Sequence, residues 1–127
     1  MANIEELDID LGIIRDELID WEQGVWFTGI SQLDSKGAQS ELPPCGTACC
    51  LFGLAAWRAG WRPTRHSDLW VLHGQVADIV DIGMDIFNIT LDQASVLSRP
   101  MNTFGALMRM RDALAADSEA DLSAGLR

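Results

Sequence analysis

Three cysteines lie within six residues of the chain and two histidines follow them, so thiol chemistry is the first possibility that the sequence raises. Cys45 would stand at the start of a helix predicted for residues 45–59, where backbone N–H groups and the helix dipole lower the pKa of a thiol. His66 or His73 would have to act as its general base. Cys45 is therefore the candidate catalytic residue, although packing as a small apolar side chain is the simpler interpretation.

The same residue types could hold a zinc ion, with Cys45, Cys49, His66 and His73 as the candidate ligands. Three residues separate the two cysteines, which zinc sites allow, whereas six residues separate the histidines, which is outside the usual range. No Cys-x-x-Cys pair occurs, and an odd number of cysteines is a poor disulfide framework. We therefore expect reduced thiols, no bound metal and no other cofactor.

The charge of the chain is strongly negative, with 19 acidic residues against nine Lys and Arg and a formal net charge of −10. Binding to nucleic acid or to an anionic membrane is not expected, because phosphate groups must be neutralised by positive charge. The segment 4–22 holds eight acidic residues and one arginine. Such a face could imitate a row of phosphates and occupy a basic groove of a partner protein, or it could only keep the domain in solution. The candidate partner-binding residues are Asp16, Glu17, Asp20 and Glu22.

Residues 57–66 form a connector in which tryptophan and arginine alternate, and its arginines are Arg58, Arg62 and Arg65. Interleaved aromatic and cationic side chains can stack bases and contact phosphates, which gives a nucleic-acid-associated module as an alternative function. Three arginines are few against the overall negative field. Pairing with the acidic first helix, or covering tryptophan faces, is the favoured interpretation of these arginines.

The positions of the apolar residues predict an all-α fold. Apolar side chains recur at spacings of three and four along an N-terminal helix that we expect to stop near Gly24. A loop over 28–44 leads into the helix 45–59, which is apolar on all sides and is therefore expected to be central and buried. Thr90 and Gln93 form a capping-box pattern at the start of a later helix. Further helices are predicted for residues 67–80, 84–87, 91–98 and from 104 onwards.

The length of 127 residues corresponds to one domain. We expect a compact single domain of five or six short helices over residues 1–116, followed by a frayed acidic tail over 117–127. No apolar run approaches the roughly 18–20 residues of a membrane span, and the acidic N-terminus does not resemble a secretory signal. The sequence therefore predicts a cytoplasmic protein without a membrane partner.

The run from Cys45 to Ala55 resembles a motif of small uncharacterised proteins of bacteria and their phages. These read Cys-Gly-Thr, two small residues, Cys, Ile or Leu, a variable residue and Gly. The structural motif here is Cys45, Gly46, Thr47, Cys50 and Gly53. Weaker matches flank it, so that the resemblance spans roughly residues 20–98. It implies a compact helical fold and a phage or mobile-element setting, and it implies no chemistry.

Together these features favour a small acidic protein without enzymatic activity, encoded by a phage and acting in the host cytoplasm. It would bind a host protein with a basic surface through the acidic N-terminal helix and the loop 28–44. The apolar stripe of that helix also leaves a homodimer open. A thiol- or metal-dependent enzyme centred on Cys45 is one alternative, and the nucleic-acid module of residues 57–66 is another.

Overall fold

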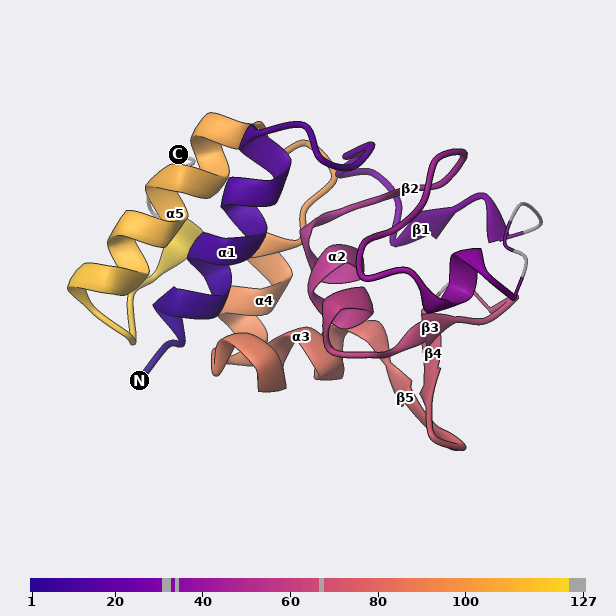
Figure 1. Cartoon of the computed structure of the whole chain (residues 1–127). Helices are drawn as coiled ribbons and strands as arrows, with labels where there is room; N and C mark the ends of the chain where they lie inside the picture. The colour runs from indigo at the N-terminus through magenta and orange to yellow at the C-terminus, as the bar shows by residue number, and fades with distance from the viewer. Residues whose placement is uncertain (31–32, 34, 67, 124–127) are drawn as a thin grey trace.

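The computed structural model describes residues 1–30, 33, 35–66 and 68–123 (Figure 1). Over these residues the chain is an α+β fold, with five α-helices and two small antiparallel sheets. The helices are α1 (Ile4–Arg15), α2 (Leu51–Arg58), α3 (Ile79–Phe87), α4 (Leu91–Leu97) and α5 (Phe104–Ala116). The strands are β1 (Phe27–Thr28), β2 (Ala48–Cys49), β3 (Arg62–Pro63), β4 (Leu69–Leu72) and β5 (Gln75–Asp78), and a short 3-10 helix, η2, covers Gly37–Gln39.

The prediction of an all-α fold is wrong, most clearly over residues 68–80; residue 67, the first of the helix predicted there, lies outside the described residues. In place of the predicted helix, β4 and β5 form a hairpin that projects from the body of the molecule (Figure 1). His73 and Gly74 make its two-residue turn, and both have positive φ, 49° and 80°. Asn-Gly or Asp-Gly is the usual sequence signal of such a turn, and here histidine takes the first position, so the sequence did not indicate a hairpin. Strand β3 adds to the open side of β4 and completes a three-stranded sheet.

The predicted central helix over 45–59 is also wrong over residues 45–50. Residues 45–47 form a turn and β2 pairs with β1, so that the helix begins only at Leu51. Cys50 caps it, because its thiol accepts a hydrogen bond from the backbone N–H of Gly53 at 3.5 Å. The remaining helix is buried as expected, since every residue from Leu51 to Trp57 is shielded from solvent.

Helix α1 ends at Arg15, well before the predicted stop at Gly24. Glu17 adopts a left-handed backbone with φ 56° and its N–H donates to the carbonyl of Ile14. The N–H of Leu18 reaches back to Ile13. This is the Schellman arrangement that usually has glycine at the left-handed position. No sequence signal marked the end of α1, because glutamate occupies that position.

Several helix boundaries were predicted correctly. The capping box of α4 is present, with Thr90 and Gln93 exchanging side-chain and backbone hydrogen bonds. Thr103 caps α5 through a bond from the N–H of Ala106. Gly60, with φ 100°, terminates α2 at the expected place.

Helix α2 lies at the centre of the core, with α1 and α3 packed against it and α5 against α1 (Figure 1). Gly53 lets the chain approach closely, because a Cβ there would lie only 2.1 Å from the carbonyl oxygen of Trp26. The ring of Phe27 stacks on Trp57 with centroids 5.5 Å apart. Segment 26–28 is thereby held against α2, which also packs against α1 and α3.

Candidate functional site

Three of the four acidic side chains of α1 form ion pairs with arginines of other helices. Asp10 is fully buried, and its Oδ1 accepts a hydrogen bond from Arg58 of α2 at 2.9 Å. Glu6, one turn earlier, accepts from the same guanidinium nitrogen at 3.3 Å. Burial raises the pKa of the Asp10 carboxyl to about 7, because Arg58 only partly offsets the lost hydration and Glu6 adds a further negative charge. Its second oxygen, Oδ2, has no hydrogen-bond partner among the described residues.

A second arginine, Arg111, holds α1 against α5. Arg111 of α5 donates to both carboxylate oxygens of Asp8, at 2.6 and 2.9 Å, and to Asp112 at 3.1 Å. The hydrogen bonds from Arg111 lower the pKa of the Asp8 carboxyl below its usual value. Glu6, Asp8 and Asp10 therefore bridge α1 to α2 and α5, whereas Glu5 is exposed and forms no ion pair with any described residue.

The four candidate partner-binding acids lie in the loop after α1, not on a helix. Asp16, Glu17, Asp20 and Glu22 are all exposed. Asp16 pairs with its neighbour Arg15 at 3.0 Å, but the other three form no ion pair with any described residue. The structure thus separates the acids of segment 4–22 into a set held by arginines of other helices, Glu6, Asp8 and Asp10, and an exposed set, Glu5 and the four acids of segment 16–22.

The cysteines lie in two different environments. Cys45 is exposed in the turn before β2, so it lacks the helix N-terminus on which its candidacy as a nucleophile rested. Cys49 and Cys50 are buried free thiols. Burial raises the pKa of Cys49 far above its ordinary value and that of Cys50 to about 11, so both stay protonated at neutral pH.

The candidate zinc ligands are not brought together. Cys49 is in the core, whereas His66 and His73 are exposed, the latter at the tip of the β4–β5 hairpin. Over the residues that the structure describes, no three histidine, cysteine or acidic side chains are grouped closely enough to hold a metal ion.

The arginines of the 57–66 connector serve the fold. Arg58 binds the acids of α1 as described above. The guanidinium of Arg62 lies 3.8 Å from the ring centroid of Trp57 and donates to the carbonyls of Ala38 and Ser40. The Trp57 indole also donates to the Ser40 carbonyl at 2.8 Å, and together these contacts fasten residues 38–40 onto α2. Arg65 alone of the three is exposed.

The structural motif of the resemblance shapes the entry into α2. Gly46 has φ 87°, a conformation that favours glycine. The hydroxyl of Thr47 is buried and donates to the carbonyl of Pro44 at 2.6 Å, which closes the turn. Together with the cap at Cys50 and the close approach at Gly53, these roles account for four of the five motif residues by backbone geometry, whereas Cys45 is an exposed free thiol.

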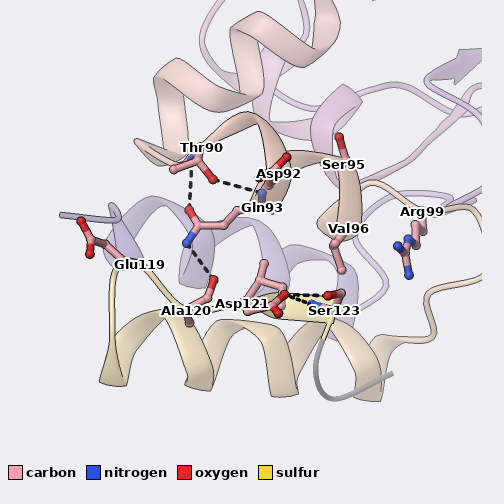
Figure 2. A pocket seen from close by; sticks show the side chains of 11 residues that line it. Thr90, Asp92, Gln93, Ser95, Val96, Arg99, Glu119, Ala120, Asp121 and Ser123 are labelled. Atoms are coloured by element: carbon pink, nitrogen blue, oxygen red, sulfur yellow. Dashed lines mark hydrogen bonds between the residues drawn. The ribbon is translucent and has the colours of Figure 1, made fainter. Parts of the chain in front are cut away.

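Two hollows lie on either side of α4. The first, of about 620 Å³, is bounded by α4 and by residues 119–123 (Figure 2). Gln93 spans it, with its side-chain amide donating to the carbonyls of Ser118 and Ala120 at 2.9 and 3.1 Å. Asp121 is engaged by Ser123, whose N–H and hydroxyl donate to its carboxylate. Leu122 is buried, so the segment after α5 packs on the domain up to this point.

The second hollow, of about 550 Å³, lies between residues 23–27 and residues 95–100. Its apolar wall consists of Val25, Trp26, Phe27 and Pro100. Its polar wall is the end of α4, with the side chains of Ser95, Ser98 and Arg99. Ser95 and Arg99 also border the first hollow, so these two residues form the ridge between the two.

Sequence reasoning missed Gln23, which joins three parts of the fold. Its buried amide donates to the carbonyl of Leu97 at the end of α4. Its oxygen accepts from the Trp21 indole at 3.1 Å and from the N–H of Leu51 at the start of α2. A glutamine between a glutamate and a glycine carries no periodicity, so only its burial reveals this role.

No family model, curated protein or solved structure matches the chain. Among the described residues, no helix has the length and apolar character needed to cross a bilayer.

Proposed function

We propose that the chain is a protein-binding module without enzymatic activity, and that it contacts a basic surface of its partner through segment 16–22. One observation carries this proposal: Glu17, Asp20 and Glu22 are exposed and unpaired among the described residues, whereas Glu6, Asp8 and Asp10 of α1 are held by arginines. Unpaired carboxylates on an exposed loop are free to contact a partner and favour fast, salt-sensitive association.

The conformation of Glu17 supports the same surface. A left-handed backbone disfavours any residue with a Cβ, and glycine is the usual occupant of this position at a helix end. Retaining glutamate there costs the fold some stability. A functional requirement for a carboxylate at the turn would account for that cost.

Other routes to a partner have less support. The apolar stripe of α1 is buried within the chain through Leu7, Leu11 and Ile14, so it offers no seam for a second helix. Cys45 lacks the helix N-terminus that would activate it, and two of the connector arginines are engaged internally. The motif resemblance supports a bacterial or phage setting, and hence a host protein in the cytoplasm as the partner.

The test compares capture of a partner from bacterial host lysate by three baits at low and high salt. The first is the unchanged chain, and the second carries D16N, E17Q, D20N and E22Q. The third is a matched control with E41Q, D68N, D85N and E119Q, which changes four exposed acids elsewhere. Both variants have a net charge of −6, since four of the charges that give −10 are removed.

We expect the unchanged chain and the control to retain the same partner at low salt and to lose it at high salt, because exposed charge pairs are screened. The segment 16–22 variant should not retain it. Equal capture by both variants would show that net charge alone attracts the partner, and no capture by the unchanged chain would contradict the proposal.

A further inference from the structure

Arg99, directly after α4, is a half-buried cation without a partner. Its side chain makes no hydrogen bond and no ion pair with any residue that the structure describes. In this acidic chain the comparable arginines Arg58 and Arg111 are both held by carboxylates. Figure 2 shows Arg99 at one end of the first hollow, apart from the carboxylate of Glu119 at the other.

Capping of α4 does not explain this arginine. A cation at a helix end commonly bonds the last carbonyls of the helix. Here the amide of Asn102 donates to the carbonyls of Val96 and Leu97, at 2.9 and 3.0 Å. The amide of Gln23 adds a second bond to Leu97 at 3.1 Å. The end of α4 is therefore satisfied by neutral amides, and the guanidinium remains available.

Two hydroxyls accompany Arg99 on one face of the chain. Ser95 and Ser98 precede it by four and one residues, and all three side chains border the second hollow. Neither hydroxyl has a hydrogen-bond partner among the described residues. Hydroxyl and guanidinium donors that border one hollow can each donate to the oxygens of an anion.

The rest of the second hollow is uncharged. Val25, Trp26, Phe27 and Pro100 supply apolar surface, and no described acidic residue borders it, although the chain has 19 acidic residues. Its volume of about 550 Å³ lies within the range of small-molecule sites. An apolar wall opposite a few convergent polar groups is the general form of such sites.

We propose that the second hollow binds a carboxylate carried by an apolar group. The guanidinium of Arg99 holds the carboxylate, with Ser95 and Ser98 as further donors, and the apolar group lies against Trp26. A free amphipathic acid or the C-terminal residue of a peptide would each supply this chemistry. The site uses none of the residues of segment 16–22, so it stands or falls independently of the proposed protein partner.

The experiment is an NMR titration of the full chain, followed at the Trp26 indole N–H. The probes are 3-phenylpropionate, as a free acid, and an N-acetylated peptide ending in phenylalanine. Their amides, 3-phenylpropionamide and the C-terminally amidated peptide, keep the apolar group and remove the charge. Saturable shifts with the acids and weak or absent shifts with the amides are expected, and the tighter acid identifies the source of the ligand.

Two variants localise the site. R99Q should weaken binding of the acids by about tenfold or more, the usual effect of losing a charge-assisted hydrogen bond. R109Q, which removes an exposed charge on α5, is the matched control and should leave affinity unchanged. Gly24→Leu should block the hollow, because a Cβ there meets only the Cβ of Pro100, at 4.0 Å, and the backbone accepts a side chain.

The proposal would be overturned if neither acid gave a saturable shift in the millimolar range. It would also be overturned if acids and amides bound equally, or if R99Q and R109Q weakened binding to the same extent. A folded Gly24→Leu variant that still binds the acids would place them outside this hollow.

Discussion

Helix α1 and segment 16–22 carry four acidic residues each but use most of them in opposite ways. On α1, Asp10 and Asp8 point at arginines of α2 and α5 and tie three helices together. In segment 16–22, Glu17 and Asp20 face solvent and have no basic partner among the described residues. A run of acidic residues in a sequence is thus not one surface, because the fold decides which charges remain available.

The largest expected effect comes from removing Arg58, the partner of the buried Asp10. Arg58→Met leaves the buried carboxylate of Asp10 without a cation, so we expect the free energy of unfolding at pH 8 to fall by about 4 kcal/mol. Urea unfolding measures this change. Arg65→Met, which removes an exposed arginine of the same connector, is the control and should change stability by less than about 0.5 kcal/mol.

The pH dependence of stability provides a second test of the acids on α1. The Asp10 carboxyl has a pKa of about 7 in the folded chain against an ordinary value of 3.8, so the native state binds its proton more tightly than the unfolded state does. Its contribution to stability is therefore fully present below about pH 4 and is lost as pH rises to about 7. Asp8 works in the opposite sense, because its lowered pKa adds stability that is lost in acid.

The variant Asp10→Asn isolates the pH-dependent contribution of the Asp10 carboxyl to the free energy of unfolding. The difference in unfolding free energy between the unchanged chain and the variant should decrease between pH 4 and pH 7, by at most about 4 kcal/mol at 1.36 kcal/mol per pKa unit. Urea unfolding at a series of pH values measures it. A difference that stays constant over this range would show that Asp10 does not titrate there.

A smaller effect is expected at the second bridge. Asp8→Asn removes a bidentate ion pair that is partly exposed, with 27% of the Arg111 side chain accessible, so solvent screens much of its energy. We expect a loss of about 1 kcal/mol at neutral pH and low salt, and less at high salt. Thermal unfolding at two salt concentrations tests both parts, and a loss as large as that of Arg58→Met would contradict the assigned burial.

The smallest single-residue effect is a gain in stability, and it is expected at Glu17 in segment 16–22. Glu17→Gly relieves the left-handed backbone and should raise the free energy of unfolding by up to about 1 kcal/mol, less the extra entropy of glycine in the unfolded chain. Gly should bring a smaller gain at Asn88, since asparagine tolerates this conformation better. A destabilised Glu17→Gly variant would mean that the carboxylate supports the fold after all.

How far the sequence predicted the structure depended on whether a local signal existed. The capping box at Thr90 could be recognised because its side chains act within a few residues, and the end of α2 because a glycine, Gly60, lies there with a positive φ. The end of α1 could not, because glutamate occupies a position where glycine is typical. The β4–β5 hairpin was missed because an apolar stretch broken by His73 and Gly74 also fits helical spacing.

The candidate site was predictable in composition but not in arrangement. The sequence identified the acids of segment 4–22 and suggested that connector arginines would pair with them or cover tryptophans, as Arg58 and Arg62 do. It could not say which acids would be left exposed, because that depends on contacts between residues about fifty positions apart, such as Asp10 and Arg58. The unpaired state of Arg99 likewise follows only from the tertiary fold.

The separate roles of the two sets of acids are tested most directly by urea unfolding of two variants side by side at neutral pH. One carries E6Q and D8N on α1, and the other carries D20N and E22Q in the loop, so each loses two negative charges. The α1 variant should lose about 1–2 kcal/mol, and the loop variant should stay within about 0.5 kcal/mol of the unchanged chain. Equal losses from both variants would show that the loop acids are also structural, and would contradict the division.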